Sequence, residues 1–469
     1  MTKQPGWLDR AAGVLLASAA GDALGAAYEF GYPSPDELIL MKGGGPFGFE
    51  PGEWTDDTSM ALAVARVTAT GADVRGGAGL DAVAAGFVEW YDSHPKDIGN
   101  QTRRVLSRRD PSATTMTATA SALTGQKGGN GSLMRTAAIG IGYLDDAEGC
   151  LKAAAAVGAL THDDERATEA CQLWSFAIRH AVLHGTFDGV HRFLDKADKG
   201  TVAYWAPLIE QAETGSPRDF PNNGWVVHAL QTAWWAITHA DATDARHLQD
   251  ALELCVRAGN DTDTTAAIAG ALLGARWGVS AVPAEWRRKL HGWPGLRPRD
   301  LVRLGILTAR HGRDDHQGWP SVPVFQNEPH WDTSRQPVPH PHDAGVHLSG
   351  YDAALSGGYD AVVSLCRMGS AGLDADHVEF WLVDEDGANP NLAFVIDDAA
   401  RTIQALRAEG KTVLLHCVEG RSRTPSVAAR YSQLLGRDPQ DVLAAMGVTP
   451  RAELWNAATR DADTTGGAR

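Results

Sequence analysis

Two pairs of aspartates, far apart in the sequence, have the composition of a metal site. Asp56 and Asp57 are adjacent, and Asp261 and Asp263 follow much later in the chain. Threonines flank both pairs: Thr55, Thr58, Thr262 and Thr264. Oxygen ligands without histidine or cysteine suit hard divalent ions, namely magnesium, manganese or calcium, rather than zinc. If the two pairs meet in the fold, they supply enough negative charge for two ions that polarise an oxygen-rich substrate.

A structural interpretation of both pairs is also open. Asp, Ser, Thr and Asn are the residues that most often cap helix N-termini, and acidic residues in a first turn favour the helix dipole. Spacing alone does not decide between a metal site and doubled helix caps.

A second pattern with chemical potential begins at Cys417. The apolar run Thr412–His416 is typical of a buried strand, and Cys417 opens a loop that leads into a predicted helix. Backbone amides and the helix dipole stabilise a thiolate in such a position. Five residues separate Cys417 from Arg423, so backbone N–H groups can surround a phosphate while the guanidinium binds two of its oxygens. Cys-x5-Arg alone is a weak signal, and three further residues strengthen it: His416, Gly420 and Thr424.

The elements that must position the aspartate pairs are helices. Apolar residues recur at helical spacing from residue 7 to about 310, with few alternating β-branched runs. The predicted helices include Leu62–Thr68, Ala153–Leu160, Ala167–Val182, Trp225–Ile237 and Ala266–Arg276. Short polar loops precede several of these helices, so a helical bundle can bring the loops together at one site.

The composition changes after this helical region. Prolines punctuate the next stretch, at Pro320, Pro323, Pro329, Pro337, Pro339 and Pro341. Strand-like runs at Tyr359–Cys366, Val378–Val383 and Thr412–His416 then alternate with predicted helices at Phe394–Ala408 and Ser426–Leu435. We therefore assign 1–312 to an all-α bundle, 313–344 to a proline-rich linker and domain entry, and 345–469 to a small α/β domain with a central parallel-type sheet.

Bulk properties limit the classes of partner. A chain of 469 residues is long enough for two domains. Its net charge of −16 argues against a nucleic-acid or anionic-membrane partner, because phosphates would be repelled at long range. The five cysteines form neither a disulfide framework nor a CxxC zinc pair, which fits a reducing cytoplasm.

The N-terminal segment needs separate attention. Ala11–Ala20 is apolar and follows Lys3 and Arg10, as in a signal peptide. The run is rich in alanine and continues directly into Gly21–Gly25, where cleavage would damage a motif used below. We therefore expect a cytoplasmic protein, without a segment of transmembrane length.

Four motifs occur in order in the first domain: Gly21–Phe30, Trp54–Met60, Gly129–Arg135 and Gly259–Thr264. A fifth, weaker motif is Thr161-His162. Together they resemble the ADP-ribosylglycohydrolase family. The resemblance implies an all-α fold with a binuclear magnesium site, in which manganese can replace magnesium. By motif, the implied metal ligands are Thr55, Asp56, Asp57, Asp261, Asp263 and Thr264.

The same resemblance implies roles in substrate binding and catalysis. Glu29 matches a glutamate that family members place beside the scissile bond. The glycine-rich loop matches the one that wraps the diphosphate of ADP-ribose, with Gly129, Asn130, Gly131 and Ser132 as substrate-binding residues. His162 would lie near the ribose or its phosphate, although a helix-capping surface histidine is an equal alternative.

The implied reaction is hydrolysis of a glycosidic bond at the anomeric carbon of the ribose distal to adenine. Carboxylates would offset the charge that develops on the sugar. The base that deprotonates the attacking water would be Asp56, Asp57 or Glu29. Motifs that all members share do not predict which acceptor linkage is cleaved.

The segment Val413–Thr424 resembles the dual-specificity branch of the protein tyrosine phosphatases, and the resemblance extends over about residues 345–460. It implies that Cys417 is the nucleophile, that Arg423 binds the phosphoryl group and that Thr424 assists release of the thiolate. The general acid is expected in the acidic loop 383–387, where the spacing to Asn391 favours Asp386 over Asp384.

These inferences predict a bifunctional enzyme. It would remove ADP-ribose from modified acceptors with two magnesium ions and would also be a cysteine-dependent phosphomonoesterase. In the alternative, the C-terminal domain is a non-catalytic phosphate-binding or regulatory module. The expected partners are an ADP-ribosylated protein or small molecule and a phosphorylated substrate, with no membrane and no nucleic acid other than an ADP-ribosylated one.

Overall fold

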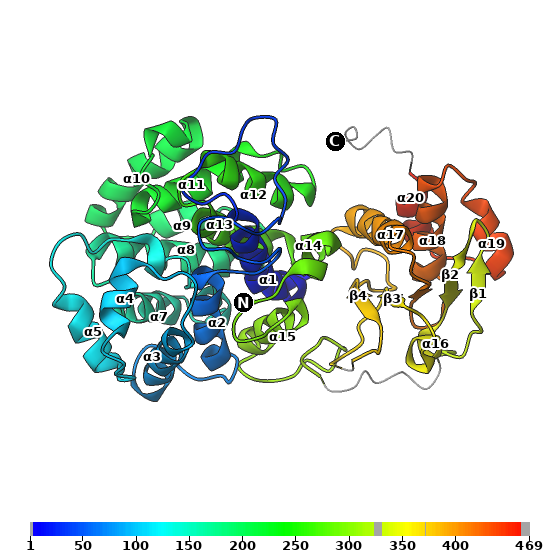
Figure 1. Cartoon of the computed structure of the whole chain (residues 1–469), viewed down its shortest axis with the longest axis horizontal. Coiled ribbons are helices and arrows are strands. Elements are labelled where there is room, and N and C mark those ends of the chain that lie inside the picture. The colour runs from blue at the N-terminus through cyan, green and yellow to red at the C-terminus, as the bar shows by residue number, and fades with distance from the viewer. Residues whose placement is uncertain (1–2, 323–330, 371, 461–469) are drawn as a thin grey trace. The chain divides into compact units, whose positions relative to one another are not determined.

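The computed structural model describes residues 3–322, 331–370 and 372–460, and the chain forms two compact units (Figure 1). Unit 1 comprises Met1–Val282 and Trp286–Asp314, and unit 2 comprises Pro283–Glu285 and Asp315–Arg469. The predicted linker 313–344 is thus not a separate segment, because unit 2 already begins within it. Pro323 and Pro329 of that linker, and the C-terminal positions 461–469, lie outside the described residues.

Unit 1 is built from helices, and residues 3–314 contain isolated β-bridges but no strand. The helices are α1 (Trp7–Gly25), α2 (Asp56–Thr68), α3 (Gly77–Asp92), α4 (Asn100–Leu106), α5 (Ala113–Ser121), α6 (Ala137–Gly142), α7 (Ala147–Ala159), α8 (Glu165–His184), α9 (Gly189–Leu194), α10 (Lys199–Thr214), α11 (Val226–His239), α12 (Arg246–Ala258), α13 (Thr262–Trp277) and α15 (Pro298–Ala309). Helix α14 (Ala284–Lys289) is divided between the two units. The all-α prediction for this region is confirmed, and the predicted helices lie within α2, α7, α8, α11 and α13 with small differences at their ends.

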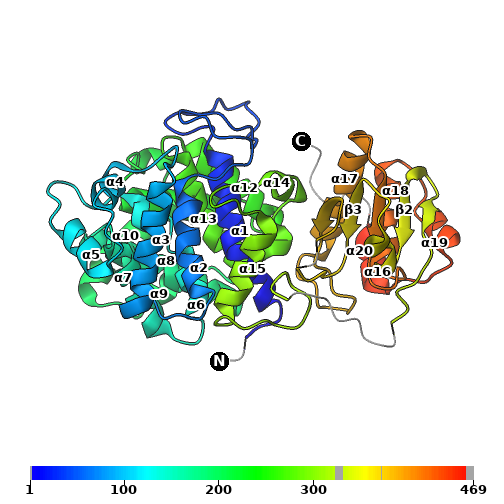
Figure 2. The same cartoon turned by 60° about the horizontal axis from the view of Figure 1, so that its bottom comes forward.

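Helices α1 and α13 form the centre of unit 1 and lie side by side in both views (Figures 1 and 2). Every residue of α1 from Arg10 to Gly25 is buried, as is nearly all of α13. A helix that is apolar around its whole circumference belongs inside a protein. The segment Ala11–Ala20, which has the pattern of a signal peptide, is therefore the core of this helix. Among the described residues, no helix is both long enough and apolar enough to cross a membrane.

Glycines allow the two central helices to approach closely. A Cβ atom on Gly13 would lie 2.5 Å from the carbonyl carbon of Gly278, and one on Gly25 would lie 2.5 Å from Cα of Asp263. Real Cβ atoms do not come this close to backbone, so each glycine is required for the contact. The contact at Gly25 brings the end of α1 directly against the start of α13, where the second aspartate pair lies.

Unit 2 contains a mixed five-stranded sheet in the order β1-β2-β5-β3-β4. Its strands are β1 (Val338–His340), β2 (Asp343–Ser349), β3 (Ala361–Ser364), β4 (Asp376–Glu379) and β5 (Val413–His416). Strands β2, β5, β3 and β4 are parallel, as expected for the predicted parallel-type sheet, and β1 adds an antiparallel edge strand, so the sheet is mixed. Strands β1 and β2 were not predicted. In β1 the proline at position 339 interrupts the strand pattern, and a proline is tolerated on such an edge strand.

Helices cover both faces of this sheet. Helices α17 (Leu392–Ala408) and α18 (Arg423–Leu434) pack on the face that carries Val363 and Leu415, together with the shorter α19 (Gln440–Met446) and α20 (Ala452–Thr459). Helix α16 (Tyr351–Ser356) packs on the opposite face, which carries Val362 and Leu414. The carboxyl ends of the four parallel strands are in register, with Ser349 and Ser364 both opposite His416. Ligands of α/β proteins bind at this edge.

The close contact between α1 and α13 leads to a stability prediction. Gly25→Ala should destabilise unit 1 by about 1–3 kcal/mol, because the new methyl group would overlap backbone that cannot move away. Gly158→Ala in α7 is the matched control, since its Cβ would meet nothing nearer than 3.5 Å and alanine favours a helix. Urea unfolding followed by circular dichroism measures both changes. Equal stability of the two variants would contradict the role assigned to Gly25.

Candidate active sites

The aspartate pairs lie at the starts of two helices without capping them. Asp56 and Asp57 occupy the first turn of α2, and Asp261 immediately precedes α13. Neither N-cap residue, Thr55 or Asp261, accepts a capping hydrogen bond on its side chain. Helix α8 shows the ordinary arrangement, since the Asp164 carboxylate accepts the backbone N–H groups of Arg166 and Ala167. The paired carboxylates are therefore not explained as helix caps.

The two pairs converge in the interior of unit 1. Asp57 Oδ2 accepts a hydrogen bond from Thr55 Oγ1 at 3.1 Å and another from Thr264 Oγ1 at 3.3 Å. Because Thr264 belongs to α13, hydroxyl groups from the starts of both helices meet on one carboxylate. Carboxylate oxygens of Asp57 and Asp263 lie within 4.8 Å of one another, as do those of Glu29, Asp261 and Asp263. The structure thus brings together five of the residues that the motifs implied as metal ligands, Thr55, Asp57, Asp261, Asp263 and Thr264, whereas Asp56 is adjacent to Asp57 in the first turn of α2.

Asp22 of α1 anchors this cluster, although sequence reasoning did not select it. Its Oδ1 accepts Thr55 N at 2.9 Å, and its Oδ2 accepts Thr58 N at 2.9 Å and Thr58 Oγ1 at 2.6 Å. Asp22 is fully buried, and an oxygen of its carboxylate lies within 4.8 Å of Asp57 and Asp263 oxygens. A possible signal was available, because Asp22 is the only acidic residue in the motif Gly21–Gly25.

Two carboxylate oxygens of the cluster have no hydrogen-bond partner. These buried atoms are Glu29 Oε2 and Asp57 Oδ1. A buried polar oxygen without a partner is costly, whereas a cation or proton would satisfy it. The donor set is oxygen only, which is the chemistry that magnesium and manganese prefer.

Burial and mutual repulsion shift the pKa values of these carboxyl groups upward. The pKa of Glu29 is raised to about 9, first by burial and then by the charges of Asp261 and Asp97. Burial raises the pKa of Asp22 to about 6, and its hydrogen bonds from Thr58 and Thr55 oppose this shift. Burial followed by neighbouring carboxylates raises the pKa values of Asp56, Asp57 and Asp263 well above the ordinary range. The cluster therefore demands protons or cations at neutral pH.

Asp97 is a further acidic residue that sequence reasoning missed. It lies between α3 and α4, and its charge contributes to the raised pKa values of Glu29 and Asp56. Burial also raises its own pKa. A lone aspartate in a loop carries no recognisable pattern, so only the fold identifies it.

The predicted phosphate loop is tied to the acidic cluster. Residues Asn130–Ser132 form a short 3-10 helix, η1. The Asn130 side chain donates to Asp261 Oδ2 at 2.7 Å and to Asn223 O at 2.9 Å. The backbone N–H of Asn130 is already bonded to Gly224 O at 3.1 Å, so this amide does not bind a ligand in this arrangement. Asn130 therefore orients a predicted metal ligand.

His162 and Ser132 lie deeper than the sequence suggested. His162 is 3% exposed, and its ring lies beneath the glycine loop, so that Cβ atoms added to Gly129 and Gly131 would be 3.3 Å and 3.0 Å from it. Burial lowers the pKa of His162 well below its ordinary value, and Thr161 Oγ1 is hydrogen-bonded to Nδ1 at 2.7 Å. Ser132 is fully buried near Cys171. His162 therefore supports the loop as a neutral residue and is not a surface cap.

The cysteine loop of unit 2 has the predicted strand–loop–helix arrangement. Strand β5 ends at His416, Cys417 is 1% exposed, and α18 begins at Arg423 rather than at the predicted Ser426. Gly420 has a φ of +69°, and an added Cβ would lie 2.7 Å from Ser349 O. Only glycine satisfies both conditions, so the tight turn of the loop depends on it.

Arg423 is held at the bottom of this loop. Its Nη1 donates to Leu382 O at 2.8 Å and to Leu365 O at 3.2 Å, while its buried Nε has no hydrogen-bond partner. Thr424 is fully buried, and its hydroxyl donates to Ser349 O at 3.4 Å. The Nε–H of the guanidinium therefore makes no hydrogen bond within the described residues.

The acidic loop presents Asp384 to Arg423, and not the predicted Asp386. Asp384 Oδ2 lies 3.9 Å from Arg423 Nε, and Asp384 Oδ1 lies 3.1 Å from Arg451 Nε. Asp386 is exposed. Spacing to Asn391 indicated Asp386, but the carboxylate that pairs with Arg423 is that of Asp384. The candidate general acid is corrected to Asp384.

Comparisons with known proteins identify unit 1. The sequence profile of ADP-ribosylglycohydrolase matches residues 3–315. The chain belongs to the ADP-ribosylglycohydrolase family. The ADP-ribosylarginine hydrolase Tri1 of Pseudomonas putida (strain GB-1) is 32% identical over 304 residues, which cover 60% of this chain and 74% of that protein. The ADP-ribosyl-[dinitrogen reductase] glycohydrolase of Rhodospirillum rubrum is 31% identical over 294 residues, which cover 60% of this chain and 90% of that protein.

Solved structures agree for the ADP-ribosylglycohydrolase unit only. An ADP-ribosylglycohydrolase-related protein complex has a TM-score of 0.52 and 28% identity, covering 66% of this chain and 99% of that chain. A human tyrosine phosphatase-like serine/threonine/tyrosine-interacting protein has a TM-score of 0.22 and 16% identity, covering 24% of this chain and 88% of that chain. The second likeness is too weak to carry an argument, so the chemistry of unit 2 rests on its own residues.

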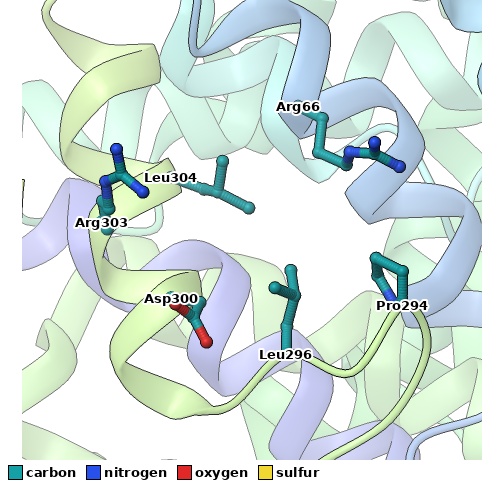
Figure 3. A pocket seen from close by; sticks show the side chains of 6 residues that line it. All are labelled: Arg66, Pro294, Leu296, Asp300, Arg303 and Leu304. Atoms are coloured by element: carbon teal, nitrogen blue, oxygen red, sulfur yellow. The ribbon is translucent and has the colours of Figure 1, made fainter.

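A pocket of about 230 Å³ in the ADP-ribosylglycohydrolase unit lies apart from these residues (Figure 3). It is lined by Arg66, Pro294, Leu296, Asp300, Arg303 and Leu304. None of the predicted site residues lines it, and Arg66 already pairs with Glu89 at 3.1 Å. This pocket is not part of the candidate active site.

The raised pKa values predict how stability depends on pH in the presence of EDTA. A carboxyl group with a raised folded-state pKa binds its proton more tightly in the folded than in the unfolded protein, so stability is lost as pH rises. We expect the melting temperature of unit 1 to fall between pH 5 and pH 9, a range that includes the values of about 6 for Asp22 and about 9 for Glu29.

Asp263→Asn should make this dependence shallower, because one buried charge is removed. Asp195→Asn is the control, since that side chain is 62% exposed. Its Oδ2 lies 3.5 Å from Nη1 of Arg192, which is equally exposed. Calorimetry in EDTA at several pH values measures both. A melting temperature of unit 1 that rises from pH 5 to pH 9 would rule out the buried acidic cluster.

Proposed function

We propose that unit 1 removes ADP-ribose from modified acceptors with the help of divalent metal ions, and that ADP-ribosylarginine is the first linkage to test. The observation that carries this proposal is the convergence of Asp57, Asp263 and Glu29, with unpartnered buried oxygens on Asp57 and Glu29. The names of the two relatives, one an ADP-ribosylarginine hydrolase and one acting on ADP-ribosyl-dinitrogen reductase, support the substrate class.

The residues present fit two magnesium ions, with manganese as a substitute. The proposed ligands are Thr55, Asp56, Asp57, Asp261, Asp263 and Thr264. When bound, such ions supply positive charge that polarises substrate oxygens and offsets the mutual repulsion of the carboxylates. The unpartnered oxygens and the oxygen-only donor set are the support for this assignment.

Each residue of the site then has a physical task. The two threonine hydroxyls fix Asp57 Oδ2, which leaves Oδ1 for a ligand. Asn130 orients Asp261, and Asp22 holds the first turn of α2 in place. Carboxylates beside the reacting sugar stabilise positive charge as the glycosidic bond breaks, and one of them accepts a proton from the attacking water. Asp56, Asp57 and Glu29 remain the candidates for that base.

Hydrolysis assays test this proposal. Purified protein should release ADP-ribose from ADP-ribosylarginine, EDTA should abolish release, and added magnesium should restore it. Asp57→Asn and Asp263→Asn should lower kcat by about a hundredfold or more, because the electrostatic preorganisation of the site is lost. The exposed variant Asp195→Asn should retain wild-type activity. Undiminished turnover in EDTA, together with no magnesium binding by calorimetry, would overturn the metal assignment.

Unit 2 has the features of a cysteine-dependent phosphomonoesterase, which we propose as its activity. The observation that favours it is Arg423 at the end of the loop that begins at Cys417, whose buried Nε makes no hydrogen bond and lies 3.9 Å from Asp384 Oδ2. The Cys417 thiolate would attack phosphorus while the P–O bond to the leaving group breaks, and Asp384 would protonate the departing oxygen. Water would then hydrolyse the phosphocysteine and release phosphate and the free thiol.

Turnover of an aryl phosphate tests unit 2. Cys417→Ser should abolish phosphate release, and Asp384→Asn should lower kcat at least tenfold because the leaving oxygen loses its acid. Asp386→Asn is the matched control and should behave like wild type, since that side chain is exposed. If no aryl phosphate is turned over, or if Cys417→Ser is fully active, unit 2 is instead a phosphate-binding or regulatory module.

A further inference from the structure

A row of polar side chains crosses the sheet of unit 2 behind the cysteine loop. His416 ends β5, Ser364 ends the neighbouring β3, and His377 belongs to β4 on the far side of β3. Ser364 Oγ lies 2.6 Å from His416 Nε2 and 2.8 Å from His377 Nε2. On the other side of its ring, His416 Nδ1 lies 3.1 Å from the carbonyl oxygen of Cys417. Three strands thus contribute to one chain of hydrogen bonds.

The direction of each hydrogen bond follows from the chemistry of the atoms. A carbonyl oxygen only accepts, so His416 Nδ1 carries a proton and donates it to Cys417 O. Burial, opposed by the hydrogen bond to Cys417 and assisted by the charge of Arg423, lowers the pKa of His416 to about 4, so the ring is neutral at pH 7 and its Nε2 is an acceptor. Ser364 must therefore donate its single hydroxyl proton to His416, and His377 Nε2–H must donate to Ser364.

An acidic residue, Glu379, lies beside the far end of the row. His377 Nδ1 lies 3.9 Å from Glu379 Oε1 on the same strand, and Trp381 Nε1 donates to Glu379 Oε2 at 2.8 Å. Glu379 is 6% exposed, and His416 and Ser364 are fully buried. Tyr351 of α16 makes an edge contact with the His416 ring, with 6.3 Å between ring centroids. Ser364 and His416 are thus shielded from water, whereas the His377 side chain is 11% exposed.

We propose that Ser364 and His377 are positioning residues of the cysteine loop, which fix the tautomer of His416 and thereby hold the Cys417 carbonyl. This inference rests on the proposed phosphatase chemistry of unit 2. The peptide that follows Cys417 is the first of the loop, so anchoring its carbonyl fixes the plane in which the next N–H lies. Backbone N–H groups that point into the loop stabilise both a thiolate and a bound phosphate.

The positioning role predicts a change in the ionisation of Cys417. Ser364→Ala removes the donor to His416 Nε2, so the ring can turn or change tautomer and the Cys417 carbonyl is released. The midpoint for alkylation of Cys417 by iodoacetamide, followed by mass spectrometry of its peptide, should move upward by about one pH unit. His377→Leu should act in the same direction, whereas His377→Gln, which keeps a side-chain N–H, should restore a value near that of wild type.

A matched control exists in the same unit. Ser432 is also a fully buried serine between two histidines, with its hydroxyl 3.3 Å from His340 Nε2 and 3.1 Å from His342 Nδ1. Ser432→Ala should leave the Cys417 midpoint unchanged, although it removes the same group. No shift in Ser364→Ala, or an equal shift in Ser432→Ala, would overturn the proposal.

The kinetics of aryl phosphate turnover distinguish failure of the phosphatase proposal from failure of the positioning proposal. If the phosphatase proposal holds, Ser364→Ala should lower kcat about tenfold and move the acidic limb of the pH profile with the alkylation midpoint. If wild type shows no turnover but the alkylation midpoint of Ser364→Ala shifts as expected, the phosphatase proposal fails and the positioning role stands. If turnover is normal in Ser364→Ala and the midpoint does not move, the phosphatase proposal stands and the positioning role fails.

Discussion

The close packing of α1 against α13 is the constraint on which the active site of unit 1 depends. It places Asp22, at the end of one buried helix, beside Asp263, at the start of another. Carboxylates in the protein interior repel one another, and nothing in their own chemistry keeps them together. The backbone contact at Gly25 keeps them in place, because the helices cannot separate without exposing a large buried surface. The free energy gained by packing α1 against α13 thus offsets the cost of burying these carboxylates close together at the candidate site.

Helix starts are used for different purposes within this one chain. At α8, Asp164 satisfies the free backbone N–H groups of the first turn. At α2, the acidic residues of the first turn are directed away from such capping, and Asp22 of another helix accepts the N–H of Thr55 and Thr58. This exchange of partners leaves the carboxylates of Asp56 and Asp57 available for a ligand. The same residue types therefore have a structural role in one place and a chemical role in another, depending on which group satisfies the backbone.

Much of this arrangement could be predicted from sequence, because the chemistry is concentrated in short motifs. Apolar periodicity predicted α2, α7, α8, α11 and α13, and the order of motifs predicted which aspartates would meet. Residues that act through the fold escaped prediction. Asp97 acts on the cluster through its charge from a loop without any pattern, and Asp384 rather than Asp386 pairs with Arg423, which spacing along the sequence did not indicate. Strand β1 was missed because its proline obscures the strand pattern.

The two units bury groups of opposite charge at their candidate sites. Unit 1 concentrates negative charge and leaves acceptor oxygens on Glu29 and Asp57 without donors, so it is complementary to cations. Unit 2 places the Arg423 guanidinium after the carboxyl edge of its sheet, where Nε makes no hydrogen bond and Asp384 Oδ2 lies 3.9 Å away. The net charge of −16 describes neither environment. Buried polar atoms of opposite sign thus stand at the two candidate sites, and these atoms are among the features on which the proposals for the two units rest.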